Sequence, residues 1–535
     1  MDTKEIAKLV TFIEENLRAS QIAGLSFVDA RHFRTRLLSG QNHVVFGRRG
    51  AGKTSLVQAI KNTNKHIYVY LNLEDYKDIT FPNIVIHVLV ELFNSLKEQI
   101  RMSIRFWRFR PKVIRVTYRI YQTVKGLKQY IHEPDQETID VKTTKNENLL
   151  LSVSAQRSSM AAGAKGQIGK SKEIIRKLPK NKIDYLRLKL TGYKSLLINI
   201  KEIFNDAHIY LVLDDFYFVD KNSQPELVDY FHRITKGTDL FLKLATIKYR
   251  TKLYRRPEDK IIGVEIGHDI FEIDMDYTLD NSEELQAFMH QLLSNAIEKS
   301  CAHVDIDKMF SGDGFPQLCL ASGGVPRDFL WLFVKLANNI VSSDGLIGKT
   351  QVNESAIANL GNKLESMKRD SGDEDVILED YLKRIKRYVY DEKRTNTFLI
   401  AKDDLESDDQ GRQAIRELVD LRILHLVDHN TSKAPSDGRR YEAYMLDISL
   451  YDNARPRKFN QVEPGQTDEK ARKDLLRASP LILFDKLREP ISVEPSQTTD
   501  KVQKDSPQTS SSNSYDKPRK PTSEELQGQL SLSYE

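Results

Sequence analysis

The stretch HVVFGRRGAGKTSLVQAI, at residues 43–60, decides the fold of this chain of 535 residues. From Gly47 to Thr54 it matches the pattern G-x-x-x-x-G-K-[ST], in which the backbone N–H groups of a glycine-rich loop surround phosphate oxygens. The apolar run before the loop is typical of a buried strand, and the apolar spacing after it is typical of an amphipathic helix. Strand, loop and helix thus follow one another in the order that a triphosphate-binding site requires.

The residue types in this loop predict a bound nucleoside triphosphate with Mg²⁺. Lys53 would reach the β- and γ-phosphates, and the Thr54 hydroxyl would bind Mg²⁺. We expect the other contacts from the loop and the start of the helix, which together comprise Gly47, Arg48, Arg49, Gly50, Ala51, Gly52, Lys53, Thr54 and Ser55. The alternative is a chance glycine-rich turn, and the strand and helix on either side argue against it.

A second apolar run, IYLVLDD at residues 209–215, ends in two acids, as the Walker B pattern does. Asp214 would hold a Mg²⁺-bound water, and Asp215 would polarise the water that attacks the γ-phosphate. Many such ATPases carry glutamate at the second position, and the shorter aspartate predicts slow turnover. Two acids after a strand are equally typical of a surface turn, but the phosphate loop favours the catalytic interpretation.

A third apolar run, LFLKLATI at residues 240–247, places Thr246 near the carboxyl end of another strand. Its hydroxyl would contact the γ-phosphate or the attacking water. A basic cluster follows, in which Arg250 is the first candidate for an arginine finger toward a neighbouring subunit. An ordinary solvated basic loop is an equally good interpretation of this cluster, which consists of Lys248, Arg250, Lys252, Arg255 and Arg256.

The alternation of apolar runs and helical patterns predicts an α/β fold, with a parallel sheet joined by crossover helices. The Ser-, Pro- and Gln-rich tail is too polar to bury a core, so we expect it to be disordered. Its one apolar patch, SPLILFDKL at residues 479–487, would either dock a partner, which we favour, or pack back on the core. The predicted divisions are a helical lead-in at 1–40, a P-loop ATPase core at 41–275 with a long insertion at about 100–180, a helical lid at 276–370, a winged-helix-like domain at 377–453 and the tail at 454–535.

The segment SGGVPRDFLWLF, at residues 322–333, places Arg327 at a helix start, directly after Pro326. This resembles the sensor 2 motif of AAA+ ATPases, in which an arginine of the lid reaches the γ-phosphate. The alternative is an arginine that pairs with local acids. The whole order of motifs over residues 30–450 resembles the origin-recognition and initiator clade, and it is also similar to the related STAND signalling ATPases. The long interval at 74–207 and Asp215 depart from that pattern.

The resemblance implies an ATPase core, a lid and a winged-helix domain, with ATP and Mg²⁺ as cofactors. ATP rather than GTP rests on the resemblance alone, since no base-reading NKxD motif follows the strands.

The most basic stretch is RMSIRFWRFRPKVIRVTYRIYQTVKGLKQY, at residues 101–130, with nine Lys or Arg and no acid. Aromatic residues alternate with the cations, which suits phosphate neutralisation together with base stacking. The candidate nucleic-acid contacts here are Arg105, Arg108, Arg110 and Arg115. A second interpretation is a helical hairpin without a binding role, in which the aromatic residues belong to the core and the cations are solvated. A third is that this stretch binds an anionic membrane surface.

In the winged-helix-like segment, the helix from Gly411 would enter the major groove of DNA. The turn that follows would touch phosphates through Lys433, Arg439 and Arg440. Acids in or near the same helix favour a protein contact or a packed lid instead; they are Asp408, Asp409, Glu417 and Asp420.

The composition narrows the class of protein further. A net charge of +5 points to no particular partner, and two distant cysteines exclude a disulfide scaffold or a zinc finger. The amino terminus lacks a signal-peptide pattern, and no apolar run is long enough for a membrane span, so we expect a cytoplasmic protein without an integral membrane segment.

Two hypotheses for the function follow. The first is an ATP-dependent switch of the initiator type that binds nucleic acid, DNA in the first instance, and hydrolyses ATP slowly. The second is a STAND-like signalling or scaffold ATPase, for example in antiviral defence, that forms a homo-oligomer or recruits a partner effector protein. A metabolic kinase would not call for the lid and the winged helix.

Overall fold

The computed structural model describes residues 2–17, 27–61, 66–103, 111–131, 136–144, 173–204, 207–257, 260–279, 281–343, 345–371, 375–452, 456–463 and 469–488. Three of the predicted nucleic-acid contacts, Arg105, Arg108 and Arg110, lie outside these residues. Within them, no helix combines the length and the apolar character that a membrane span requires.

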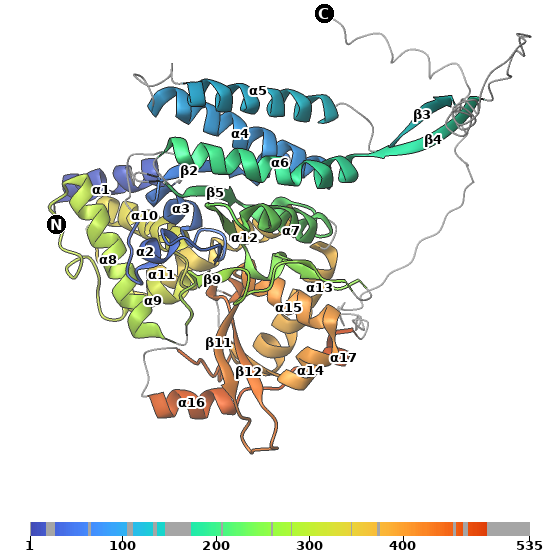
Figure 1. Cartoon of the computed structure of the whole chain (residues 1–535). Coiled ribbons are helices and arrows are strands. Elements are labelled where there is room, and N and C mark those ends of the chain that lie inside the picture. Colours follow the sequence, from blue (N-terminus) through green and yellow to red (C-terminus); the bar gives the residue numbers. More distant parts are fainter. Residues whose placement is uncertain are drawn as a thin grey trace, which may run out of the picture. The chain divides into compact units, whose positions relative to one another are not determined.

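A five-stranded parallel sheet forms the centre of the core, with the strand order β2-β5-β6-β1-β9 (Figure 1). The strand before the phosphate loop, β1, is flanked by β6 and β9, and β5 lies beyond β6. Because parallel strands end at the same edge, the phosphate loop, Asp214 and Thr246 meet there. The sheet confirms the predicted α/β fold; its strands are β1 (His43–Phe46), β2 (Ile67–Asn72), β5 (Ile209–Asp214), β6 (Leu240–Thr246) and β9 (Phe271–Asp274).

The strands read as continuous apolar runs because both faces of the sheet are covered. Alternate side chains point to opposite faces, so Val44 and Val45 of β1 belong to two different clusters of the core. On the Val45 face the sheet packs against α2 (Phe33–Leu37) and α3 (Lys53–Ala59). On the Val44 face it packs against α4 (Asn83–Ser103), α6 (Lys182–Ile203) and α7 (Ser223–Thr235).

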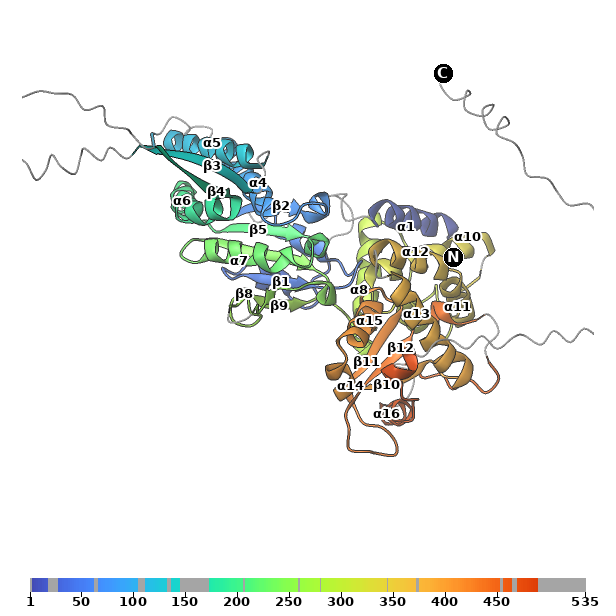
Figure 2. The ribbon, with the colours of Figure 1, turned by 90° about the vertical axis from the view of Figure 1, so that its right-hand side faces the viewer.

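The long interval between β2 and β5 folds into α4, α5 (Pro111–Ile131), a β-hairpin and α6 (Figure 2). The hairpin pairs β3 (Gln136–Thr144) with β4 (Glu173–Asn181) in antiparallel register. Helix α5 packs on the outside of α4 and α6, away from the sheet. It is held by one apolar stripe at helical spacing, Val113, Val116, Ile120, Val124 and Leu127.

Five helices follow the core and form the lid. The amino-terminal helix α1 (Thr3–Asn16) packs against α8 and α10, so the predicted lead-in belongs to the lid by its contacts. Lys8 Nζ donates to the backbone carbonyl of Cys301, and the backbone N–H of His303 donates to Glu5. The lid helices are α8 (Ser282–Ser300), α9 (Gly314–Ala321), α10 (Pro326–Ser343), α11 (Lys349–Ile357) and α12 (Leu360–Ser371).

The remaining described residues, 375–452, 456–463 and 469–488, form the carboxy-terminal module. Its antiparallel sheet has the order β10-β12-β11. The helix, strand, helix, strand, strand order predicted from the sequence is present, with one additional short helix, α14. The elements are α13 (Asp375–Lys386), a π-helical turn (Arg387–Glu392), β10 (Thr397–Ala401), α14 (Lys402–Ser407), α15 (Asp409–Asp420), β11 (Leu424–Thr431), β12 (Tyr441–Leu446), α16 (Glu469–Arg477) and α17 (Phe484–Arg488).

The apolar patch of the predicted tail, at residues 479–487, packs back on the carboxy-terminal module. Backbone hydrogen bonds of 2.9 Å join Leu399 N to Pro480 O and Ile482 N to Leu399 O, along the open edge of β10. Buried Ile482 and Phe484 supply the apolar surface that the rest of the tail lacks. Partner docking through residues 479–487, which the sequence analysis favoured, therefore does not fit this structure.

Candidate nucleotide site and its connections

The glycines of the phosphate loop serve both conformation and close packing. Gly50 and Gly52 have φ of +89° and +94°, in the left-handed region that favours glycine. A Cβ on Gly50 would lie 2.9 Å from Cβ of Arg327, at the start of lid helix α10. The backbone N–H of Arg327 also donates to the Gly50 carbonyl at 3.3 Å. Any larger residue at position 50 would push the lid away from the loop.

Lys53 is buried and folds over its own loop. Its Nζ donates to the backbone carbonyls of Gly47 at 2.8 Å and Arg48 at 3.2 Å. Burial lowers the pKa of Lys53, while the nearby carboxylates of Asp215 and Asp214 oppose that shift. The phosphate oxygens of a triphosphate would replace these two carbonyls as stronger, charged acceptors.

Asp214 and Asp215 differ sharply in their surroundings. Asp214 is fully buried, and its carboxylate accepts from the backbone N–H of Asp215 and from the Tyr70 hydroxyl, each at 2.9 Å. Asp215 has a left-handed backbone, with φ of +51°, and lines the nucleotide cavity. Burial, followed by the charge of Asp214, raises the pKa of Asp215 to about 6.

These residues fit a divalent cation that arrives with the nucleotide. The two groups that donate to Asp214 are neutral, and Lys53 is a nearby cation that acts on its buried carboxylate. A divalent cation would offset the remaining cost of burying charge here, because Asp215 lies beside the same lysine. Thr54 lies in the cavity wall at the first turn of α3. Thr54 and Asp214 would therefore hold Mg²⁺, which would offset phosphate charge in the transition state.

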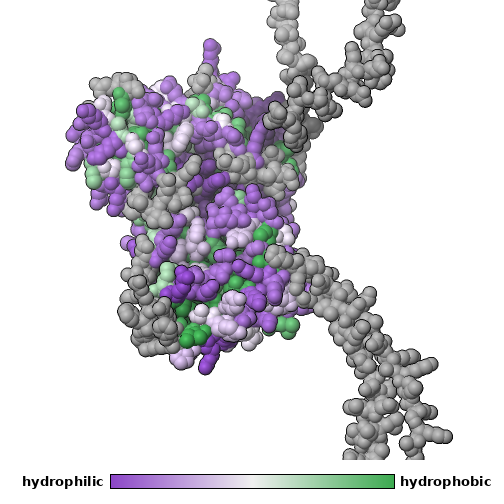
Figure 3. Space-filling view, turned by 90° about the horizontal axis from the view of Figure 1, so that it is seen from above, coloured by the Kyte–Doolittle hydropathy of each residue, from purple (hydrophilic) through white to green (hydrophobic). Residues whose placement is uncertain are grey.

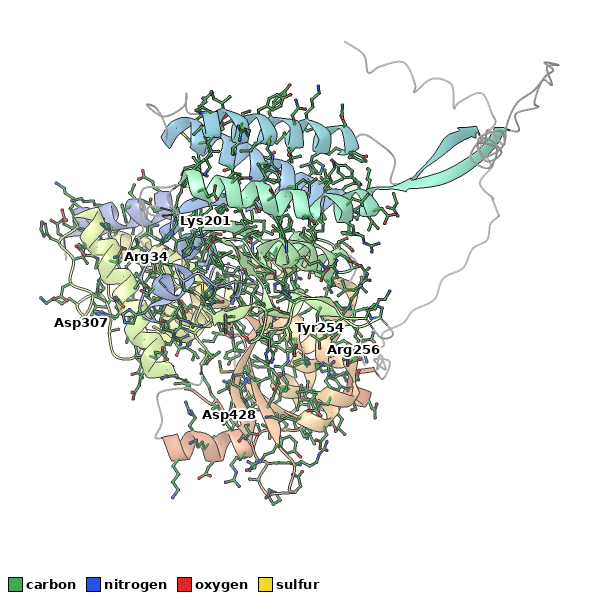
Figure 4. The ribbon with its side chains drawn as sticks, viewed as in Figure 1. Arg34, Lys201, Tyr254, Arg256, Asp307 and Asp428 are labelled. Carbon is green, nitrogen blue, oxygen red and sulfur yellow. The ribbon has the colours of Figure 1, made fainter. Side chains whose placement is uncertain are left out.

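A cavity of about 1230 Å³ joins the phosphate loop to the lid. Its polar end is formed by residues 49–55 with Asp215 and Arg327. Its apolar end is formed by Phe27 and Val28 of the lead-in with Phe288 and Leu292 of α8, which suits a nucleobase. Arg34, labelled in Figure 4, also lines it.

Arg327 lies where the resemblance to the sensor 2 motif predicts it. Its side chain lines the cavity beside the phosphate loop. Burial lowers its pKa, and the neighbouring cations Arg422 and Arg49 act in the same direction, while Asp328 and Asp215 oppose. The triphosphate contact itself stays a prediction.

Arg48 does not line the cavity, unlike residues 49–55 of the loop and the helix start. Its guanidinium donates to the Tyr277 carbonyl at 3.0 Å and lies 3.4 Å from Asp276 Oδ1, directly after β9. Asp276 Oδ1 also accepts from the backbone N–H of Arg48 at 2.9 Å. The Arg48 side chain and its backbone N–H therefore brace the loop against the residues that follow β9, so the predicted nucleotide contact of Arg48 does not fit this arrangement.

Thr246 and Arg250 are both buried, and their surroundings differ from those that their predicted roles lead us to expect. Thr246 is fully buried, and its hydroxyl lies 2.5 Å from that of Thr251, on the loop after β6. Arg250 is only 8% exposed and lies in the electrostatic neighbourhood of Asp420 in the carboxy-terminal module. As placed, Arg250 is not presented to a neighbouring subunit. Arg256 of the same cluster, labelled in Figure 4 close to Tyr254, is exposed.

Helix α15, predicted to enter the major groove, instead lies against the core. The backbone N–H of Tyr249 donates to Asp420 Oδ2 at 3.1 Å, and Lys221 pairs with Glu417 at 3.4 Å. Glu417 and Asp420 are 2% and 5% exposed. At the other end of the helix the ring of Phe484 covers Gly411. Glu417 and Asp420 therefore serve a contact within the protein, the alternative that the sequence analysis left open, whereas Asp408 and Asp409 interact with their own helix.

The module also contacts the lid. Arg422, directly after α15, pairs with Asp328 at 2.5 Å, one residue from Arg327. His425 of β11 lies so close to Gly323 that a Cβ there would be 2.1 Å from the imidazole. Asp447 accepts from His425 at 2.8 Å and from Lys363 at 2.7 Å. The arginine-bearing turn of the lid is thus held by the module.

The predicted cations of the module turn are partly engaged. Arg439 pairs with Asp403 and Asp404 of α14, while Arg440 is exposed.

Helix α5 presents its predicted cations to solvent. Arg115, Lys125 and Lys128 are exposed, and so are the aromatic rings of Tyr118 and Tyr121, at 61% and 51%. These two tyrosines are not core residues, which counts against a hairpin whose aromatic residues all belong to the core. Seen from above, the visible face is largely hydrophilic, with smaller hydrophobic patches between (Figure 3).

Sequence reasoning missed Tyr70, Asp276 and Arg422. The only signal for Tyr70 was the alternation HIYVYLNL, which places Tyr68 and Tyr70 on one face of a strand. Nothing local marks Asp276 or Arg422, because their partners are distant in the sequence.

Comparisons with known proteins identify a family for this chain. A family model described as ORC-CDC6-like matches residues 10–313, which is more than half of the chain. No curated protein matches the sequence. Among solved structures, the Walker-type ATPase PABY2304 of Pyrococcus abyssi is 13% identical with a TM-score of 0.36, covering 81% of this chain and 98% of its own. The Aeropyrum pernix ORC1 protein in complex with DNA is 11% identical with a TM-score of 0.33, covering 83% and 94%. By its family match, parallel sheet and phosphate loop, this chain is an AAA+ P-loop ATPase of the initiator type and belongs to the ORC-CDC6-like family.

Proposed function

We propose that the protein is an ATP-dependent switch that binds DNA in a nucleotide-controlled way and hydrolyses ATP slowly. The observation that carries the proposal is the cavity between phosphate loop and lid, with Arg327 in its wall and Gly50 in contact with the lid backbone. A γ-phosphate in this cavity would be held from both sides. Its presence or loss would therefore bias the position of the lid.

Slow hydrolysis fits the second acid of the β5 edge. Asp215 has a side chain one methylene shorter than glutamate, and its backbone is fixed in the left-handed region. Both features limit how far its carboxylate reaches toward a water. Such an enzyme would spend most of its time in the ATP-bound state, as a switch requires.

The exposed face of α5 is the part of the described chain that best suits DNA. Its cations would neutralise phosphates, and Tyr118 and Tyr121 would contact sugars or bases. Such binding falls steeply with salt because each neutralised phosphate releases counterions.

The test is duplex DNA binding by fluorescence anisotropy, at two salt concentrations, with and without a non-hydrolysable ATP analogue. We expect analogue-strengthened, salt-sensitive binding that Lys53→Ala loses. Lys308→Glu serves as the control, since this exposed lysine lies on the lid and pairs only with Asp305. DNA binding that is absent, or indifferent to nucleotide, would overturn the proposal.

One observation favours the second candidate, a STAND-like signalling ATPase that assembles or recruits an effector. The winged-helix-like module uses α15 for protein contact, which is the chemistry of a docking module. This candidate predicts nucleotide-dependent oligomers in the cytoplasm, measurable by light scattering, with no response to DNA.

A further inference from the structure

Tyr70 lies on β2, the edge strand next to β5, and touches the acid expected at the metal. Its hydroxyl donates to Asp214 Oδ2 at 2.9 Å. In the strand register Tyr70 is opposite Val212, and Asn72 is opposite Asp214. Tyr70 thus starts two residues before Asp214 on the neighbouring strand. Only a long side chain with a terminal donor spans that separation, because each residue advances about 3.3 Å and strands lie about 4.8 Å apart.

The chemistry of this contact suits orientation rather than neutralisation. A phenol is a neutral donor, so Asp214 keeps its negative charge for a cation, whereas a lysine in its place would compete with the metal. Asp214 Oδ1 is fixed by the backbone N–H of Asp215. With one bond to each oxygen, the carboxylate plane is set while each oxygen retains a free lone pair.

The Tyr70 ring is itself held in place. It stacks on Tyr68 with the two ring planes 11° apart. The Tyr68 hydroxyl donates to the Val57 carbonyl at 2.7 Å, in the helix that follows the phosphate loop. A chain of contacts therefore runs from α3 through both rings to Asp214. Tyr254 of β7 (Tyr254–Arg255) is exposed and does not line the nucleotide cavity, which makes it a matched control for Tyr70.

We propose that Tyr70 is a positioning residue for the magnesium–triphosphate site, which orients Asp214 and so sets the Mg²⁺ concentration needed for tight triphosphate binding. The inference rests on the proposed nucleotide function. Hydrogen bonds to a metal-ligating carboxylate are worth about 10–100-fold in metal affinity or activity in other proteins. Tyr70→Phe removes the hydroxyl and keeps the ring that stacks on Tyr68.

The test is a binding titration on the full chain, with a fluorescent non-hydrolysable ATP analogue at increasing MgCl₂ and in EDTA. We expect Tyr70→Phe to raise the Mg²⁺ concentration for half-maximal tightening by about tenfold. Its affinity for the analogue in EDTA should equal that of the wild type. Tyr254→Phe, which removes an exposed hydroxyl outside the cavity, should respond to Mg²⁺ like the wild type.

The other outcomes separate the two levels of inference. If Tyr70→Phe and the wild type respond to Mg²⁺ alike, or if Tyr70→Phe loses EDTA binding and thermal stability together, the positioning role is wrong. If the wild type fails to bind the analogue, or Lys53→Ala binds it equally well, the nucleotide function itself fails, whatever Tyr70 does.

Discussion

Helices α5 and α15 carry the two surfaces that the sequence predicts for DNA, and the structure treats them in opposite ways. Helix α5 buries one apolar stripe and leaves its cations and two tyrosines in solvent. Helix α15 buries Glu417 and Asp420 against the core. Arg422, two residues after this helix, forms an ion pair with Asp328 of the lid. The sign of the charge distinguishes them. The basic helix α5 leaves Arg115, Lys125 and Lys128 exposed to solvent. The acids Glu417 and Asp420 of α15 instead pair with Lys221 and with the backbone N–H of Tyr249.

The largest expected effect is on stability, at the lid end of α15. Arg422 and Asp328 are 12% and 14% exposed, so Arg422→Ala leaves a nearly buried carboxylate without its partner. We expect a loss of about 3 kcal/mol in the free energy of unfolding. Arg115→Ala on α5 should change it by less than about 0.5 kcal/mol, since that side chain is exposed. Urea denaturation measures both, and equal losses would erase the contrast between the helices.

The next largest expected effect is on DNA binding, where charge reversal on α5 should matter more than charge reversal on α15. Reversing two exposed cations of α5, with Arg115→Glu and Lys125→Glu, should weaken duplex binding at least about tenfold at low salt. Arg412→Glu on α15 is the matched change, and we expect it to leave affinity within about twofold, because α15 faces the core. Fluorescence anisotropy titrations measure both affinities. A larger loss of duplex affinity for Arg412→Glu than for the α5 variant would contradict the assignment of DNA binding to α5.

A smaller effect concerns pH and the docking of α15. Burial and the nearby Asp276 raise the pKa of Asp420 to about 8, while the Tyr249 N–H, Arg250 and Arg48 oppose the shift. The docked form therefore holds a proton that an undocked, solvated Asp420 would release at its ordinary pKa near 4. Docking should weaken as pH rises from about 4 to 8, and the melting temperature should fall with it. Asp420→Asn should flatten that fall over pH 6–8; an unchanged slope would exclude this carboxyl as the cause.

The smallest effect is expected at the module turn. Arg439 already pairs with Asp403 and Asp404, and such surface pairs contribute at most about 1 kcal/mol. Arg439→Ala should therefore alter DNA affinity less than Arg440→Ala, whose side chain is exposed. A larger loss for Arg439 would show that the turn binds DNA after releasing its acids.

The nucleotide site was predictable because its signals are local. The loop at 47–54 and the acids at 214–215 each lie within one strand and the turn after it, and parallel strands bring such turns together. The lid arginine was placed through a resemblance rather than through its own pattern. The alternation of apolar runs and helical patterns also predicted a parallel sheet with crossover helices, but the strand order and the fifth strand, β9, come from the structure alone.

What failed depended on partners that are distant in the sequence. Arg48 stands inside the loop motif, but Asp276 and Tyr277 draw its side chain away. Arg250 is in a basic cluster that looks solvated until α15 is placed beside it. The apolar patch at 479–487 had two possible surfaces, and only the unpaired edge of β10 decides between them.

The packing of α1 on the lid also has a consequence for the order in which the chain folds. Glu5 and Lys8 find their partners at His303 and Cys301, almost 300 residues later. During synthesis the first helix must therefore wait, with its apolar face uncovered, until the whole core has emerged. Such long-range closure is slow, since loop entropy is lost before the contact is gained. The joint between α1 and the lid would therefore form only after the core between them has emerged.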